Sequence, residues 1–401
     1  MDFESLKTIL IAGVNTRPIV KSAKKLGFET IAVDRFNDID LRKYADHLYS
    51  LENVIRKGKI DKFRKEKYFE LIHGALESHN VDAVILTSGL EHEYEKIRKL
   101  EKRTSIIGNE SDRLKFSEDT EKLFSLADKL GIPHPDTEKV ENLDEALQAA
   151  ADIGYPVLLK PSRSGGGIGI RLAESSREVE DDFDEVTEKD PEGNVYVQKY
   201  IRGINASASV ISNGKESRCL SVNEQIIGDK SLNVPRKFGY CGNIIPLSAE
   251  DGITSKISKY SETICSEIGV VGSNGVDFII GDKPYLVEVN PRFQNTIDMI
   301  EGSFDLNLLE MHIESTEGKL PEKKDLKRSS TKLIIYAKRD IRAPKLNRLS
   351  TILDIPRKNS KIEKEEPICS ILKFGEKRDK TTEEAYKLAR KVQQKCYRAS
   401  R

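Results

Sequence analysis

The stretch that ends at Arg292 constrains the fold of this chain more than any other feature. In Tyr285–Arg292 (YLVEVNPR) apolar and polar side chains alternate, which is typical of a half-buried strand. Glu288 and Asn290 are two residues apart, so they leave the same face of that strand. A turn at Gly281–Pro284 would fold this strand back on a preceding one that carries Asp277. Because Mg²⁺ takes carboxylate and amide oxygens together with nucleotide phosphates, the pattern predicts a magnesium site, against the alternative of ordinary surface residues on a sheet.

Length and composition exclude several classes of protein. At roughly 100–200 residues per domain, 401 residues predict about two to four domains. Basic and acidic residues are equal at 66 each, which gives no reason to expect nucleic acid or an anionic membrane as a partner. No apolar run reaches the roughly 18–20 residues of a membrane span, and no signal peptide is recognisable, so a cytoplasmic protein is expected. Five dispersed cysteines without a CxxC pair indicate reduced thiols and argue against disulfides and zinc.

The beginning of the chain predicts a parallel sheet. The apolar runs Thr8–Ala12 and Thr30–Val33 flank a helical pattern at Pro18–Leu26, and this strand, helix, strand order places helices on the faces of a parallel sheet. Gly13–Thr16 does not match the G-x-G-x-x-G spacing, which excludes the dinucleotide fingerprint. Three polar residues near the strand ends are candidate substrate contacts, although turn and capping chemistry is favoured for them: Asn15, Arg17 and Asp34.

A glycine-rich segment follows a buried strand in the middle of the chain. The strand Val157–Leu159 presents Lys160 at its end, and four glycines lie within Gly165–Gly169. Glycines allow the backbone to approach a ligand closely, and their N–H groups can hold phosphate oxygens. The GK[ST] ending of a Walker loop is absent, which excludes that kind of phosphate site. Lys160, five residues before the loop, is placed to neutralise a phosphate that the loop covers.

Two further segments are predicted to border the same site. Asn194–Ile201 is a strand whose backbone can meet an adenine edge, while Tyr200 and Ile201 line an apolar slot. Lys237–Pro246 is predicted to be a glycine-punctuated loop that folds over the site, with glycines at 239 and 242 suited to movement.

The C-terminal part of the chain differs in character. After a short basic and polar stretch, Thr331–Ala337 and Pro367–Leu372 are predicted strands and Thr381–Tyr397 is a predicted helix. These elements predict a small appended sheet domain.

Four stretches in this order resemble the ATP-grasp superfamily, which contains D-alanyl-D-alanine ligase, biotin carboxylase and carbamoyl phosphate synthetase. They are the strand, helix, strand opening, YPVLLKPSRSGGGIGI at 155–170, YVQKYIRG at 196–203, and GVDFII with YLVEVNPR at 275–292. Within the superfamily the chain looks most like the archaeal-type predicted ATP-dependent carboligases. The resemblance implies an α/β fold of the α+β ATP-grasp type. A Rossmann-like pre-ATP-grasp domain would cover residues 1–110, a two-lobed ATP-grasp domain 111–325, with an ATP subdomain at about 131–203 and a metal-binding lobe at about 204–325, and a small β-rich domain 326–401.

The resemblance also implies roles for individual residues. Lys160 would contact nucleotide phosphates, and Arg292 would stabilise an acyl phosphate or its transition state. The metal ligands for Mg²⁺ (or Mn²⁺) would be Asp277, Glu288 and Asn290. The flexible loop over the phosphates would contain Ser164, Gly165, Gly166, Gly167 and Gly169. The adenine hinge would be Gln198, Lys199, Tyr200 and Ile201.

Two positions depart from the family pattern. The first ATP lysine of many relatives would fall near Asp119-Thr120, neither of which is basic, and Lys115 is predicted to substitute for it. Asn205 stands where the family usually has a ribose-binding Glu.

The implied activity is a carboxylate-amine ligase that uses ATP and Mg²⁺ to make an acyl phosphate from a small carboxylic acid and then an amide with an amine. One alternative is a carboxylase that takes bicarbonate. Another is an ATP-binding module without turnover, which the two departures suggest and the complete metal set argues against. The expected partners are ATP and small-molecule substrates, and a homodimer is expected by analogy.

Overall fold

The computed structural model describes residues 5–52, 65–163, 165–190, 193–250, 252–346 and 350–398. Its N-terminal part is a parallel sheet in the order β3-β2-β1-β4-β5. The strands are β1 (Thr8–Gly13), β2 (Glu29–Asp34), β3 (His47–Ser50), β4 (Ala83–Leu86) and β5 (Ser105–Ile106). The helices of this part are α1 (Arg17–Lys25), α3 (Lys65–Ser78) and α4 (Tyr94–Glu101), with the 3-10 turn η2 (Leu41–Lys43).

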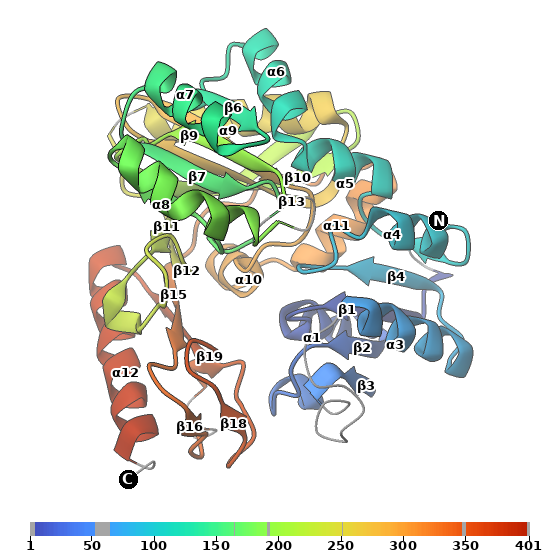
Figure 1. Ribbon diagram of the computed structural model, residues 1–401. Coiled ribbons are helices and arrows are strands. Elements are labelled where there is room, and N and C mark those ends of the chain that lie inside the picture. The colour runs from blue at the N-terminus through green and yellow to red at the C-terminus, as the bar shows by residue number, and fades with distance from the viewer. Residues whose placement is uncertain are drawn as a thin grey trace.

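Alternate residues of β1 face opposite sides of this sheet, and each side is covered. Ile9 and Ile11 belong to the same buried cluster as Val20 of α1, whereas Leu10 belongs to the cluster of Ile72 on α3. A strand buried on both faces needs apolar residues at every position, which explains the continuous run in β1. The predicted parallel sheet with helices on both faces is therefore present (Figure 1).

A second sheet is antiparallel, in the order β6-β9-β7-β8. Its strands are β6 (Thr137–Val140), β7 (Val157–Pro161), β8 (Arg171–Ala173) and β9 (Val195–Lys199). The helices α7 (Leu143–Ile153) and α8 (Ser176–Thr187) pack on one face of it through small and branched apolar side chains. Asn142 and Ser175 accept hydrogen bonds from the backbone as N-caps of these helices.

The third and largest sheet has eight strands, in the order β14-β13-β10-β11-β12-β15-β19-β17. Its strands are β10 (Ile204–Asn213), β11 (Ser217–Ile227), β12 (Tyr240–Ile245), β13 (Val271–Ile280), β14 (Pro284–Asn290), β15 (Ser329–Tyr336), β17 (Ile352–Leu353) and β19 (Pro367–Gly375). The two long C-terminal strands extend this sheet past β12 (Figure 1). The domain boundary expected near residue 326 stays a prediction.

The expectation of a mobile loop over 237–246 is wrong for most of that segment. Residues 240–245 form β12, which pairs with β11 on one side and β15 on the other. Ile244 and Ile245 are buried, and their branched side chains favour a strand more strongly than the neighbouring glycines oppose it.

The remaining elements connect these sheets. They are α5 (Ser111–Glu118), α6 (Thr120–Leu130), η3 (Lys230–Leu232), α9 (Ile253–Ile268), α10 (Ile297–Phe304), α11 (Leu308–Thr316), β16 (Ile341–Arg342), β18 (Lys361–Ile362) and α12 (Arg378–Arg398). Within the described ranges, no helix combines the length and the apolar character needed to cross a bilayer. The five cysteines are all buried and form no disulfide with one another.

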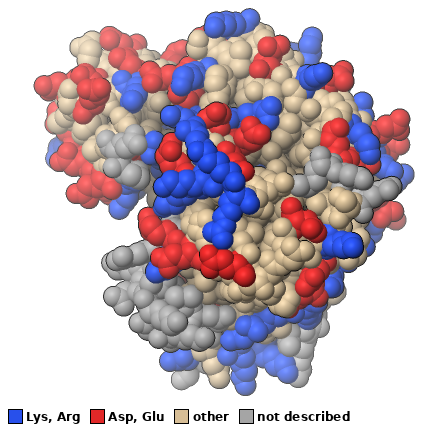
Figure 2. Space-filling model, turned by 90° about the vertical axis from the view of Figure 1, so that its right-hand side faces the viewer, with Lys and Arg blue, Asp and Glu red and all other residues tan. Residues whose placement is uncertain are grey.

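Charges of both signs are mixed on the surface. Figure 2 shows a stripe of Lys and Arg side chains across one face with acidic side chains along its borders. The mixture agrees with the equal numbers of acidic and basic residues in the sequence.

Candidate active site

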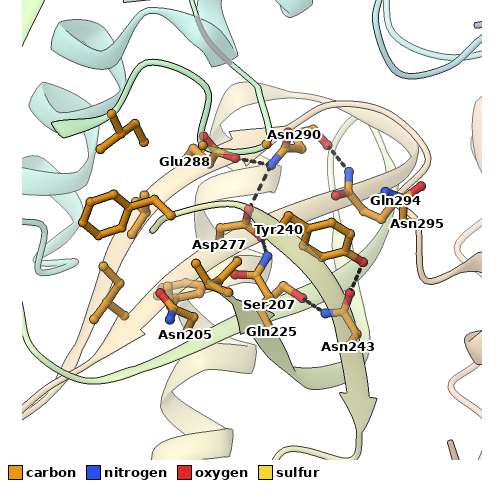
Figure 3. A pocket seen from close by; sticks show the side chains of 18 of the residues that line it. Asn205, Ser207, Gln225, Tyr240, Asn243, Asp277, Glu288, Asn290, Gln294 and Asn295 are labelled. Carbon is orange, nitrogen blue, oxygen red and sulfur yellow. Dashed lines mark hydrogen bonds between the residues drawn. The ribbon is translucent and has the colours of Figure 1, made fainter. Parts of the chain in front are cut away.

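A cavity of about 250 Å³ lies between the four-stranded and eight-stranded sheets (Figure 3). Leu158, Lys160 and Gln198 line it from β7 and β9. The opposite wall is formed by polar side chains of the large sheet, namely Asn205, Ser207, Gln225, Tyr240, Asn243, Asp277, Glu288 and Asn290. The site is therefore built where two antiparallel sheets face each other.

The predicted hairpin brings its three oxygen-bearing side chains together. β13 and β14 are antiparallel, and their register sets Asp277 opposite Glu288 and Gly275 opposite Asn290. The amide Nδ2 of Asn290 donates to Glu288 Oε1 at 2.9 Å and to Asp277 Oδ2 at 3.3 Å (Figure 3). Gln225 on β11 holds the other oxygen of Asp277 at 3.0 Å.

The electrostatics of this cluster fit a cation. Burial, followed by the neighbouring Glu288 carboxylate, raises the pKa of Asp277 well above its usual range. Two carboxylates this close favour a shared proton, and a divalent cation between them would replace that proton. The described residues contain no group of three or more His, Cys, Asp and Glu that could hold a metal. The donors here are two carboxylates and one amide, which are hard oxygen ligands suited to Mg²⁺ when the amide oxygen of Asn290 turns inward.

Arg292 lies just beyond β14 and points along the same wall. Its Nη2 donates to Asn290 Oδ1 at 3.1 Å, and its Nε forms an ion pair with Glu91 Oε1 at 2.8 Å. Glu91 lies in the loop after β4, so the N-terminal part of the chain orients this guanidinium. Burial alone would raise the pKa of Glu91, but Arg292 reverses the effect and the pKa is lowered.

Lys160 extends from β7 toward the carboxylates. Its Nζ lies 3.3 Å from Gln198 Oε1, and Gln198 is held in turn by Thr137 Oγ1 at 2.9 Å. Burial lowers the pKa of Lys160, while the Glu288 carboxylate opposes that effect. The lysine thus faces the hairpin across the cavity, as the order of the motifs predicts.

The glycine-rich loop reaches the cavity at Gly166 and Gly167. Gly167 has φ +77°, and a Cβ on it would lie 2.0 Å from the carbonyl oxygen of Phe238. Only glycine fits this close approach, which seats the loop against the segment before β12. Gly165 and Gly169 do not line the cavity, and Ser164 lies outside the described residues.

Several other predicted residues lie elsewhere. The ammonium of Lys199 is bonded to the carbonyl oxygen of Gly154 at 2.5 Å, which turns it away from the cavity. Tyr200 and Ile201 follow β9 and are not part of the cavity wall. Lys115 is exposed on α5 and is likewise not part of that wall.

The three candidate contacts in the N-terminal part have mainly structural partners. Asp34 is buried and accepts hydrogen bonds from Thr16 and Phe36, which is turn and capping chemistry. Arg17 is buried in an ion-pair network. Asn15 donates to Asp354 at 3.1 Å.

Polar residues that the sequence reasoning missed complete the wall, namely Ser207, Gln225, Tyr240, Asn243, Gln294 and Asn295. The Tyr240 hydroxyl donates to Asn243 Oδ1, and Asn243 Nδ2 lies 3.4 Å from Ser207 Oγ. The polar residues at 205, 207 and 209 alternate with apolar ones and leave one face of β10, so this pattern could have predicted a polar cavity wall.

Comparisons with known proteins show which family this chain belongs to. A family model for the ATP-grasp domain matches residues 118–296. An uncharacterized protein of Methanocaldococcus jannaschii is 30% identical over 368 residues, which cover 90% of this chain and 87% of that protein. The formate-dependent phosphoribosylglycinamide formyltransferase of Sulfurisphaera tokodaii is 26% identical over 88% of this chain and 87% of its own length. The carbamoyl phosphate synthase large chain of Clostridium botulinum is 27% identical, but the match covers only 25% of that protein.

Solved structures share the fold. Biotin carboxylase from Campylobacter jejuni superimposes with a TM-score of 0.77 at 20% identity, covering 95% of this chain and 90% of that one. An N5-carboxyaminoimidazole ribonucleotide synthetase with ADP gives a TM-score of 0.73 at 18% identity, covering 97% of each chain. Fold and relatives together define an ATP-dependent ligase. The chain belongs to the ATP-grasp family.

Proposed function

We propose that this chain is a carboxylate-amine ligase that uses ATP with Mg²⁺ (or Mn²⁺) to activate a small carboxylic acid as an acyl phosphate and then joins it to an amine. One observation carries the proposal: Asp277, Glu288 and Asn290 meet on one wall of a cavity whose opposite wall holds Lys160. Such an arrangement sets ligands for a metal ion on one side of a small space and a lysine ammonium that can bind phosphate on the other.

Each group has a defined task in the reaction. Lys160 and the N–H groups of the glycine loop hold phosphate oxygens, while Arg292 faces the charge that develops on the transferred phosphoryl group. A divalent cation held by the hairpin would neutralise charge between the terminal phosphates of ATP. A carboxylate oxygen of the acid bonds to the terminal phosphorus of ATP as the bond from that phosphorus to ADP breaks, which gives the acyl phosphate and ADP. The amine nitrogen then forms the C–N bond, the C–O bond to phosphate breaks, the amine loses a proton, and inorganic phosphate leaves.

The test is a pair of substitutions on the same hairpin. Glu288→Gln removes one charge from the cation ligands, so phosphate release from ATP should fall by about 10³-fold or more. Asp282→Asn, in the exposed turn between β13 and β14, is the matched control and should turn over normally. Lys160→Ala should weaken nucleotide binding in a direct titration. Unchanged ATP turnover in Glu288→Gln would refute the metal assignment.

Two other activities are separated by the same assay. A bicarbonate-dependent carboxylase is favoured by the likeness to biotin carboxylase, which extends over 95% of the chain and so includes the C-terminal part. Such an enzyme would release phosphate only with bicarbonate, whereas the ligase requires both an acid and an amine. A binding module without turnover, suggested by Thr120 and Asn205 in place of the usual charged residues, would bind ATP and release no phosphate.

A further inference from the structure

A second cavity, of about 660 Å³, lies between the N-terminal sheet and the strands of the C-terminal part. Its N-terminal wall consists of residues that directly follow four parallel strands, namely Asn15 after β1, Arg35, Phe36 and Asp38 after β2, Glu52 after β3 and Ser88 after β4. The strand order 3-2-1-4-5 reverses direction between β1 and β4. In open parallel sheets, the crevice at the carboxyl ends beside such a reversal is where ligands bind.

This second cavity adjoins the first. Asn295 lines both cavities. Figure 3 shows Asn295 beside Gln294 at the edge of the first cavity. The backbone carbonyl oxygen of Asn295 accepts a hydrogen bond from Lys332 at 2.9 Å, which anchors this shared residue to β15. A ligand in the second cavity would therefore border the proposed site of acyl phosphate formation.

A hydrogen-bonded junction between the N-terminal and C-terminal parts lies next to the cavity wall. Ile39 donates its N–H to the carbonyl oxygen of Ile355 at 2.8 Å. The Asp40 carboxylate accepts the N–H groups of Asp354 and Ile355 at 2.9 and 2.8 Å. Asp38 is adjacent to this junction on one side, and Arg357 follows Ile355 by two residues on the other. Both residues therefore lie close in sequence to hydrogen bonds that join the two parts of the chain.

Asp38 and Arg357 differ from other charged groups of this wall in their lack of partners within the described ranges. Lys361 pairs with Glu363 at 2.8 Å, Arg35 with Glu366 at 3.5 Å, and Asp354 with Arg17 at 2.7 Å. Neither the carboxylate of Asp38 nor the guanidinium of Arg357 has a hydrogen bond or ion pair with any residue in the described part of the chain. An anion and a cation of this kind in one pocket are complementary to a ligand that carries both charges.

We propose that the second cavity binds the amine substrate as a zwitterionic amino acid, with its ammonium group at Asp38 and its carboxylate at Arg357. This inference rests on the proposed ligase function. Burial, and then the carboxylates of Asp354, Asp34 and Asp40, raise the pKa of Asp38, although Arg17 opposes the effect, and an ammonium group beside Asp38 would stabilise its charged form. The cavity is several times the ~150 Å³ that holds a benzene molecule, which leaves room for a side chain. Its apolar lining, which includes Phe36, Ile334, Ile362 and Ile368, suits an apolar side chain.

The test measures binding to the full chain without ATP or Mg²⁺, so that it does not depend on turnover. Each standard L-amino acid is titrated by calorimetry. We expect at least one amino acid to bind. Asp38→Asn and Arg357→Gln should each weaken the affinity for that amino acid by about tenfold or more. The decarboxylated amine and the deaminated acid of the same ligand should bind more weakly than the amino acid. Exposed Asp152→Asn and Arg177→Gln are the matched controls and should bind normally.

Folding of the variants provides a second measurement. Asp38→Asn removes a carboxylate from an acidic surrounding in which no described residue pairs with it, so the ligand-free variant should melt at the same temperature as the parent or higher. A lower melting temperature would make Asp38 a structural residue and would overturn its assignment. Arg357→Gln and the two ligand analogues still decide the carboxylate half of the proposal.

The two proposals can fail separately. If no amino acid binds, or if both variants bind the amino acid as tightly as the parent does, the inference about the second cavity is wrong, even when simple amines support phosphate release. If an amino acid binds through Asp38 and Arg357 but no acid elicits phosphate release, the cavity assignment stands and the ligase function fails.

Discussion

At the scale of single residues, the side chains that carry the proposed chemistry are oriented by residues distant in sequence. Arg292 follows its own strand, but its guanidinium is held by Glu91, which lies 201 positions away. Glu91 is itself fixed by the N–H of Gly89. Both side chains of this ion pair are largely buried, so removal of one charge leaves the other without compensation.

We therefore predict that Glu91→Gln impairs catalysis without removing any group from the cavity wall. Arg292 would lose its fixed orientation, and kcat should fall by about 10²-fold while the KM for ATP changes little. Steady-state phosphate release at varied ATP measures both constants. Glu91→Asp, which keeps the charge on a shorter side chain, should recover part of the loss. A rise of similar size in the KM for ATP would instead assign Glu91 to nucleotide binding.

At the scale of elements, the large sheet depends on a close approach between β12 and β15. Gly242 has φ +149°, and a Cβ on it would lie 2.0 Å from the backbone carbonyl oxygen of Lys332. The register sets Gly242 opposite Leu333 in the ladder that joins the C-terminal strands to the rest of the sheet. The glycine that suggested a mobile loop from sequence is thus required by a strand.

Gly242→Ala should accordingly destabilise the protein by about 2–5 kcal/mol, through backbone strain and displacement of β15. Chemical denaturation at neutral pH measures the loss. Gly131→Ala is the matched control, because Gly131 at the end of α6 also has a positive φ, of +65°, but a Cβ added to it would meet no atom of the described residues within 4 Å. The control should cost only about 1 kcal/mol. An equal loss of stability in both variants would show that the close contact with Lys332 does not contribute to the effect.

At the scale of the whole molecule, a buried histidine on α11 ties the N-terminal part to the large sheet. His312 Nδ1 accepts the N–H of Ser273 at 2.8 Å, and Nε2 lies 3.2 Å from the carbonyl oxygen of Ile107. This pattern requires a neutral ring with its proton on Nε2, since a proton on Nδ1 would meet the N–H of Ser273. Burial lowers the pKa of His312 to about 4, although the Ile107 carbonyl opposes the effect.

The pH dependence of stability follows from that lowered pKa. Below the ordinary histidine pKa of 6.5, His312 is protonated in the unfolded chain, whereas in the folded chain it stays neutral down to about pH 4. The stabilisation is therefore fully present above pH 6.5 and is lost as the pH falls through this window, by roughly 3 kcal/mol in total. Denaturant unfolding across the window measures it. In His312→Gln this part of the slope should disappear, whereas His73→Gln, at the surface, should retain it.

Local sequence determined the core of the candidate site. The two-residue period of a strand is a property of the backbone, so the shared face of Glu288 and Asn290 and the return of Asp277 through a tight turn could be predicted from residues close in sequence. The same holds for Lys160 at the end of a buried strand and for the helix and strand pattern of the parallel sheet. These features need only neighbouring residues to be specified.

Only the tertiary structure decided the rest of the wall and the second cavity. Glu91, Tyr240 and Asn295 reach their places through contacts between elements that no local pattern encodes, and Lys115 and Lys199 have suitable chemistry but do not line the cavity. Asp38 and Arg357 line one cavity only because contacts such as that between Ile39 and Ile355 join distant parts of the chain. The physical reason is that a strand's period repeats every two residues, whereas the meeting of two sheets depends on how the whole chain packs its core.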